Sequence, residues 1–257
     1  MPVLEVNGLS KIYEGKKIST RALDHVSFKI EAGQFVGIMG PSGSGKTTLL
    51  NVIATIDEPT SGTLTLNGQD PQKLNKDETA LFRRRQLGFI FQRFNLLDTL
   101  TVEENIVLPL TLEGLPIHEM KSRAQSLAAR LGIEAIMKQY AGEISGGQMQ
   151  RTAIARALIH KPSLLLADEP TGNLDSRSSR EVMEAFELIN REDKTTILMV
   201  THDAIAASYC HRVLFIKDGR IYNELYRGDN RQVFFQKIID MMSLLGGESH
   251  HFPTVRL

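Results

Sequence analysis

The chain has 257 residues, and its 30 lysine and arginine residues balance its 30 aspartate and glutamate residues. This length predicts one large domain or two small ones, and the zero net charge disfavours nucleic acid as a partner. The single cysteine, Cys210, excludes a disulfide within the chain, and there is neither a signal-peptide pattern nor an apolar run approaching the ~20 residues that cross a bilayer, so we expect a protein that works outside the lipid.

The first part of the chain predicts antiparallel strands. Residues 3–6 and 22–30 are strand-like, and residues 63–68 form a third alternating stretch that ends in a turn. Tyr13 lies in a polar stretch between the first two and is expected in a loop. Its ring could stack on a nucleobase, although a tyrosine in this setting is more often an ordinary half-buried aromatic.

Residues 40–47 have the G-x-x-x-x-G-K-T pattern of a phosphate-binding loop, with a strand-like apolar run before it and helix-prone residues after it. Its glycines let backbone N–H groups turn inward around a polyphosphate, and the helix that follows adds its positive dipole end. Lys46 is expected to reach the β- and γ-phosphates, and the Thr47 hydroxyl to hold Mg²⁺. The alternative, a glycine-rich turn that happens to precede a lysine, does not explain the strand and the helix. The residues expected to bind the nucleoside triphosphate are Gly40, Pro41, Ser42, Gly43, Ser44, Gly45, Lys46, Thr47 and Thr48.

The middle of the chain predicts a helical insertion into an α/β protein. Residues 77–85 are helical, and residues 87–92 form a strand that ends on Gln92. Residues 102–139 show helical periodicity with a break at 114–116. Near the C-terminus, the apolar stripe of residues 233–245 predicts a helix that packs on this chain's own core or on a second subunit.

A second set of backbone donors is predicted at the turn Ser145-Gly146-Gly147-Gln148, which precedes a helix-prone run. Such a turn suits a phosphate contact, because a helix N-terminus leaves N–H groups free. It also suits an ordinary helix cap formed by Ser145, and as an isolated motif the cap explains it better.

Two further strand ends carry polar residues. The apolar run 163–167 ends on Asp168 and Glu169, and the run 196–200 is followed by His202. After a phosphate-binding loop, Asp168 is expected to hold Mg²⁺ and Glu169 to polarise the attacking water. His202 falls where an imidazole could reach the γ-phosphate, although a lone histidine at a strand end is more often structural.

These motifs occur in the order typical of ATP-binding-cassette (ABC) ATPases, which the chain resembles from Tyr13 to about Gly219. The resemblance implies an ATP hydrolase with an α/β fold: a P-loop core with a mostly parallel sheet, an antiparallel β subdomain and an inserted helical subdomain. It divides the chain into residues 1–92 and 161–229 of the core, residues 93–160 of the helical subdomain, and residues 230–257 of a C-terminal helix and tail.

The resemblance also implies roles for individual residues. Tyr13 stacks on adenine, His202 senses the γ-phosphate, and Gln92 binds near Mg²⁺ and links this region to a membrane partner. Ser145, Gly146, Gly147, Gln148 and Asp175 contact the ATP held by a second copy of the chain, in a head-to-tail dimer. Two mild departures are Ile144 in place of the usual leucine and Asn173 where many members have alanine.

Residues 88–105 resemble more narrowly the lipoprotein-releasing, macrolide and antimicrobial-peptide transporters, and residues 206–210, 212–219 and 230–240 resemble the bacitracin-resistance ATPase subunits. This implies an integral membrane permease as partner, a sensor histidine kinase acting with it, and a place on the cytoplasmic side of the membrane. The candidates for the wall of the permease docking groove are Arg93, Phe94, Leu96 and Leu97, although the three apolar residues could instead pack the core of the insertion. The alternatives are a lipoprotein-releasing or macrolide transporter, or a soluble ABC ATPase, which the lack of coiled-coil heptads and of a second P-loop disfavours. His250 and His251 are expected in a tail, not in a metal site.

Overall fold

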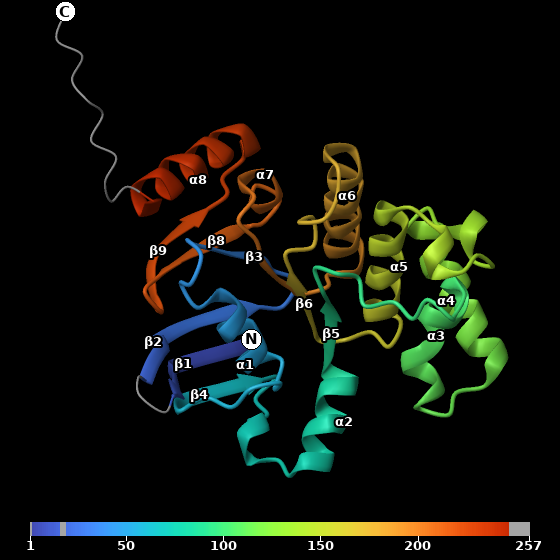
Figure 1. Cartoon of the computed structure of the whole chain (residues 1–257), viewed down its shortest axis with the longest axis horizontal. Coiled ribbons are helices and arrows are strands. Elements are labelled where there is room, and N and C mark those ends of the chain that lie inside the picture. The colour runs from blue at the N-terminus through green and yellow to red at the C-terminus, as the bar shows by residue number, and fades with distance from the viewer. Residues whose placement is uncertain (1, 16–18, 247–257) are drawn as a thin grey trace, which may run out of the picture.

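The computed structural model describes residues 2–15 and 19–246, which form two β-sheets and the helices around them (Figure 1). The strands are β1 (Pro2–Glu14), β2 (Ser19–Glu31), β3 (Phe35–Met39), β4 (Ser61–Leu66), β5 (Leu87–Ile90), β6 (Leu164–Asp168), β7 (Ile197–Val200), β8 (Arg212–Lys217) and β9 (Arg220–Tyr226). One sheet is antiparallel, in the order β2-β1-β4. The other has six strands in the order β5-β6-β7-β3-β8-β9, all parallel except β9.

The helices are α1 (Lys46–Ile53), α2 (Lys76–Gln86), α3 (Val102–Thr111), α4 (Ile117–Arg130), α5 (Gly146–Leu158), α6 (Ser176–Asp193), α7 (Ala204–Ala207) and α8 (Arg231–Gly246), with 3-10 turns at Pro71–Lys73, Glu134–Ile136 and Ala141–Glu143. Figure 1 shows α3, α4 and α5 grouped on the side of the molecule away from the antiparallel sheet. The predicted α/β fold class, with an inserted helical part, is therefore confirmed. The residue boundaries of the subdomains stay predictions. Of the helices described, none combines the length and apolarity that crossing a bilayer demands.

The parallel strands are apolar because both of their faces are covered. Every residue of β3 and β7 is buried, and successive side chains point to opposite faces. Phe35 and Met39 join a hydrophobic cluster shared with the helices, whereas Val36 and Ile38 join a second cluster shared with the antiparallel sheet. The parallel sheet is thus the middle layer of the molecule.

Parallel pairing brings the ends of the central strands to one edge. Ile38 of β3 and Asp168 of β6 both pair with Val200 of β7. The loop of residues 40–45 and the residues Glu169 and His202 directly follow these strands, so they meet at the carboxyl edge, where parallel α/β sheets bind their ligands.

Three expectations about local structure need correction. Tyr13 lies in β1, paired with Thr20 of β2, and not in a loop. The helical stretch expected to reach residue 139 stops at Arg130, because Gly132 turns the chain with a φ of 65°. The predicted C-terminal helix forms as α8 and buries Phe234, Ile238 and Leu245 in this chain's own core, but Val233 and Lys237 of the expected stripe are exposed.

The phosphate-binding loop is backed by a polar cluster around Asp24 of β2. The Asp24 carboxylate accepts a hydrogen bond from Arg220 Nε at 2.6 Å and lies 2.7 Å from His25 Nδ1. The Asp24 backbone N–H donates to the carbonyl of Gly219 at 2.8 Å, and the N–H of Gly219 donates to the carbonyl of Ser44 at 3.1 Å. Gly219 therefore connects Asp24 to the loop residue Ser44 through two backbone hydrogen bonds.

This cluster makes a prediction about pH. The hydrogen bonds to His25 and Arg220 lower the pKa of Asp24 from 3.8 to about 2. Because the folded state has the lower pKa, the stabilisation is present above about pH 4 and is lost as the pH falls towards about 2. We expect Asp24→Asn to lower the unfolding temperature at neutral pH and to have a shrinking effect below about pH 4. Thermal unfolding of both proteins over this range measures it, and an effect of equal size at every pH would contradict the charge argument.

Candidate nucleotide-binding site

The phosphate-binding loop connects β3 to α1 and presses against the backbone of neighbouring strands. A Cβ on Gly40 would lie 2.1 Å from the carbonyl oxygen of Ile216, and one on Gly45 would lie 2.3 Å from that of Ala22. Gly45 also has a φ of 101°. Only glycine fits at these two positions, so both glycines are needed for the tight curl of the loop.

The loop presents hydrogen-bond donors. Among the described residues, α1 begins with no side-chain cap, which leaves its first N–H groups and its positive dipole end for an anion. The Ser44 hydroxyl is buried and has no hydrogen-bond partner in the part of the chain that the structure describes. Lys46 Nζ folds over the loop and donates to the carbonyl oxygens of Gly40 and Pro41, at 2.9 Å each. This set of donors fits a polyphosphate.

Two carboxylates face Lys46 from the end of β6. Burial and the charge of Glu169 raise the pKa of Asp168, and Lys46 opposes this. Burial lowers the pKa of Lys46, while the charges of Glu169 and Asp168 raise it. Two acids that share one partly buried lysine leave negative charge, which favours a divalent cation.

These residues fit Mg²⁺ only together with a nucleotide. No group of three or more His, Cys, Asp or Glu side chains suited to a metal occurs within residues 2–15 and 19–246. Mg²⁺ accepts few protein oxygens when phosphate oxygens and water complete its shell. Asp168, Thr47 and the side-chain oxygen of Gln92 are the donors the chain would supply.

Glu169 and His202 contact each other at the sheet edge. Glu169 Oε2 lies 2.9 Å from His202 Nδ1 and accepts the backbone N–H of His202 at 3.3 Å. The backbone of Glu169 has a φ of 47°, which is uncommon outside glycine, and its N–H donates to the carbonyl of Val200 at 2.9 Å. The backbone conformation of Glu169 thus sets the direction of its carboxylate, which contacts the His202 imidazole. The His202 side chain is 67% exposed.

Gln92 lies just beyond β5 with an exposed side chain. Its carbonyl accepts a hydrogen bond from Asn173 Nδ2 at 2.9 Å, and a Cβ on Gly172 would lie 2.8 Å from Gln92 Nε2. From the sequence, Asn173 was notable only because many ABC ATPases have alanine at this position. The structure shows that this asparagine fastens the loop after Glu169 to the loop that carries Gln92.

The turn at Ser145 is a helix cap. Ser145 Oγ accepts the N–H of Gln148 at 3.3 Å, and Gln148 Oε1 accepts the N–H of Ser145 at 2.8 Å. Asp175 caps α6 with its carboxylate, which accepts the N–H groups of Arg177 and Ser178 at 2.9 and 3.0 Å. Ser145 is exposed, so the cap leaves this turn open to a second molecule.

Tyr13 is held by partners that sequence reasoning missed. Its hydroxyl donates to Asp57 Oδ2 at 2.6 Å, and Lys11 Nζ lies 4.9 Å from the ring centre. Burial and the bond to Asp57 raise the pKa of Tyr13, while the hydroxyl of Thr48 on α1 lowers it. The tyrosine therefore lies beside α1, and 41% of it is exposed to solvent.

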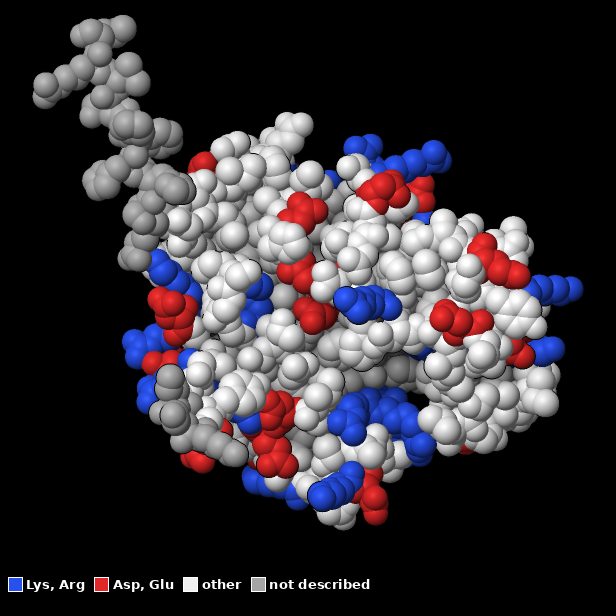
Figure 2. Space-filling model, viewed as in Figure 1, with Lys and Arg blue, Asp and Glu red and all other residues white. Residues whose placement is uncertain are grey.

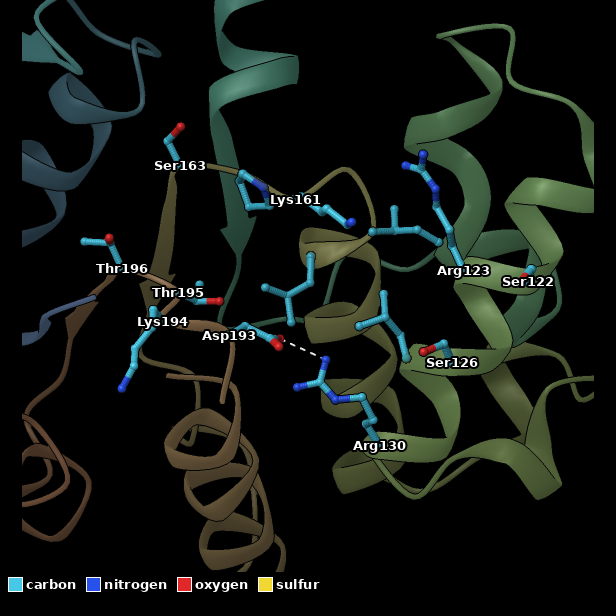
Figure 3. Close-up of a pocket in the computed structure, with 14 residues that line it drawn as sticks. Ser122, Arg123, Ser126, Arg130, Lys161, Ser163, Asp193, Lys194, Thr195 and Thr196 are labelled. Atoms are coloured by element: carbon cyan, nitrogen blue, oxygen red, sulfur yellow. Dashed lines mark ion pairs between the residues drawn. The ribbon is translucent and has the colours of Figure 1, made fainter. Parts of the chain in front are cut away.

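A hollow of about 750 Å³ lies elsewhere, between α4 and the ends of α5 and α6 (Figure 3). Its Arg130 is paired with Asp193 at 2.8 Å, and none of the predicted site residues lines it. The volume of this hollow therefore says nothing about the predicted site residues.

A phosphate-binding loop between a central parallel strand and a helix, next to a strand that ends on acidic residues, defines a P-loop nucleoside triphosphatase. Comparison of the chain with known proteins identifies its family within this class. The family model described as ABC transporter matches residues 23–172. The chain is 57% identical over 255 residues to the ABC transporter ATP-binding protein YxdL of Bacillus subtilis (strain 168), covering 99% of each.

Over 248 residues the chain is 48% identical to the bacitracin export ATP-binding protein BceA of Halalkalibacterium halodurans, covering 96% of this chain and 98% of that one. Two solved dimeric structures of the bacterial ABC transporter cassette MJ0796, one in a post-hydrolysis state bound to ADP and Pi, match with a TM-score of 0.80 and 38% identity over 88% of this chain and 99% of theirs. The chain belongs to the ABC transporter family, and it is an ATP-binding ATPase of that family, as the sequence motifs indicated.

Proposed function

We propose that the chain powers a membrane exporter as a pair of copies that share two ATP sites. The observation that carries this proposal is the assembled sheet edge, where Lys46, Asp168, Glu169 and His202 meet beside an uncapped helix. One chain supplies a complete phosphate-binding loop, and its exposed Ser145 turn is free for a second chain. The dimeric form of the MJ0796 cassette supports this arrangement.

In this proposal the loop N–H groups and Lys46 bind the β- and γ-phosphates, and Tyr13 stacks on adenine. Asp168, Thr47 and Gln92 hold Mg²⁺, which neutralises phosphate charge when it is bound. Glu169 takes a proton from the attacking water, and His202 orients Glu169 and senses the γ-phosphate. The turn from Ser145 to Gln148, together with Asp175, closes the site of the other copy.

The transported molecules are bacitracin-like antimicrobial peptides, and a permease carries them. The printed name of the 48%-identical relative, a bacitracin export ATP-binding protein, supports this substrate class. The chain then works on the cytoplasmic side of the membrane, with a sensor histidine kinase acting through the permease. Basic and acidic side chains are interspersed over the face in Figure 2, which fits a protein partner better than nucleic acid.

Deleting the gene in its own host tests the substrate class. We expect survival in bacitracin to fall and to be restored by the wild-type gene but not by a Lys46→Ala copy. Unchanged survival in bacitracin, with reduced macrolide tolerance or lipoprotein release, would instead favour a transporter of the kind named MacB or LolD.

The segment after Gln92 is the proposed permease contact. Leu97 is 47% exposed, although its N–H and carbonyl are both bound by the Asn105 side chain of α3, so the exposed side chain has a fixed place. Phe94 is half-buried at a φ of 56°, and Arg156 binds its carbonyl at 2.9 Å, so this residue belongs more to the scaffold.

We therefore expect Leu97→Asp to abolish co-purification of the permease from detergent-solubilised membranes and to abolish resistance, while ATP turnover of the isolated chain is kept. Val233→Asp on α8 is the matched control, because Val233 is 51% exposed on another part of the surface. Permease binding that survives Leu97→Asp would remove this segment from the interface.

A further inference from the structure

One face of α5 lies against the loop that follows Glu169. Gly146, Gly147 and Gln150 share this face, because residues three and four apart lie on the same side of a helix. A Cβ on Gly146 would lie 3.2 Å from Leu174 Cδ2, and one on Gly147 would lie 3.0 Å from Ser178 Cβ. The first turn of α5 therefore packs closely on the chain segment that leads away from the catalytic strand.

Gln150 makes the polar contact of this face. It is fully buried, and its Nε2 donates to the carbonyl oxygen of Pro170 at 2.8 Å. The carbonyl can only accept, so the amide nitrogen must face Pro170. The other end of the amide, Oε1, is buried without a hydrogen-bond partner in the part of the chain that the structure describes.

Stability alone does not account for a glutamine here. A buried acceptor without a partner costs free energy, and an apolar side chain of the same length would only exchange the unpaired Oε1 for an unpaired Pro170 carbonyl, so the glutamine gives little net stability. The bond to Pro170 is what the glutamine adds. Pro170 follows Glu169 directly, and Glu169 has the uncommon φ of 47°.

The backbone around Glu169 is fixed at three points. The N–H of Glu169 donates to Val200 at 2.9 Å, and its carbonyl accepts the N–H of Gly172 at 3.0 Å. Gln150 holds the next carbonyl along the chain. Strained backbone persists where its surroundings determine it from several sides, and the bond from Gln150 is the contribution of α5.

We propose that Gln150 is a positioning residue for ATP hydrolysis, which fixes the direction of Glu169 through the Pro170 carbonyl. Because α5 begins at the Ser145 turn, the same bond links that turn to the catalytic carboxylate of its own chain. When the Ser145 turn of one copy binds the nucleotide held by the second copy, this link aligns Glu169 in the nucleotide site of the first copy. This inference rests on the proposed roles of Glu169 and of the Ser145 turn.

The test is Gln150→Met in the full-length chain, compared with Thr152→Val. Thr152 is also fully buried on α5, but within the described residues its hydroxyl bonds only to the carbonyl of Gln148 in the same helix, at 2.9 Å. We expect Gln150→Met to lower kcat by roughly 10-fold to 100-fold, as a misplaced catalytic group does, with little change in KM for ATP or in unfolding temperature. Thr152→Val should leave kcat near the wild-type value. Equal losses in both variants, or a kcat loss that follows the unfolding temperature, would overturn the proposal.

A double variant with Glu169→Gln separates positioning from any other role. If Gln150 acts through Glu169, Gln150→Met should slow the already slow Glu169→Gln chain no further, because the two residues act as one unit. Fully multiplicative losses would show that Gln150 acts elsewhere. Normal turnover in Glu169→Gln alone would remove the proposed general base itself, whereas a slow Glu169→Gln chain with a wild-type Gln150→Met chain would overturn only this inference. Gln150→Leu serves if the methionine variant does not fold.

Discussion

Replacing Glu169 by glutamine is expected to lower ATP turnover by roughly 10²–10⁴-fold, the usual contribution of a positioned general base. The amide keeps the shape of the side chain and an oxygen for the N–H of His202, so ATP should still bind. Turnover measured by phosphate release, with ATP affinity measured separately, distinguishes a loss of chemistry from a loss of binding.

Two further variants serve as controls for the expected loss of turnover in Glu169→Gln. Lys46→Ala should lose binding as well as turnover, because the triphosphate loses the ammonium group that lies over the loop. Glu184→Gln, an exposed position on α6, is the matched control for loss of one glutamate charge and should behave as wild type. Near-normal turnover in Glu169→Gln would show that another group activates the water.

The sheet edge was predictable because its parts are signalled locally. Each of the strands β3, β6 and β7 is a short apolar run that ends on a polar or glycine-rich segment, and parallel strands of this kind must be covered on both faces. Once the runs are recognised as parallel neighbours, their ends must meet. The loop, Glu169 and His202 therefore follow from pattern and topology without knowledge of any contact.

Contacts between distant segments were not predictable in this way. Tyr13 finds Asp57 across 44 positions of sequence, and Asn173 finds the Gln92 carbonyl across 81. A hydrogen bond of this kind depends on register and on side-chain direction, which a single sequence does not contain. The left-handed backbone of Glu169 was missed for the same reason, since only its neighbours in the fold impose it.

The Ser145 turn had two interpretations, a helix cap and a phosphate contact, and the two are compatible. The side chain caps α5, as the isolated motif predicted, and the cap is complete within one chain. Capping fixes the direction of the N–H groups of this turn, and a fixed turn is what recognition of an outside phosphate requires. Its role at a second copy's nucleotide is still a proposal, and it leads to the second large expected effect.

Ser145→Arg in a Glu169→Gln chain is expected to prevent ATP-dependent pairing, because the long cationic side chain fills the surface that must meet the other copy. Ser145→Ala is the matched control. It removes the cap, at a cost of about 1 kcal/mol of stability, but leaves the surface open, so pairing should persist. Size exclusion with light scattering, with and without ATP, gives the mass of each variant. Pairing that survives Ser145→Arg would contradict a shared site.

Mixing two inactive variants tests the sharing directly. Each site needs the loop of one chain and the Ser145 turn of the other, so Ser145→Arg alone and Lys46→Ala alone should both be inactive. In a mixed pair, the intact loop of the Ser145→Arg chain faces the intact turn of the Lys46→Ala chain, and one site is complete. An equal mixture forms about half mixed pairs with one of two sites intact, so we expect at most about a quarter of wild-type turnover to return on mixing. If each chain instead completed its own site, a mixture that light scattering shows to contain pairs would stay as inactive as its parts.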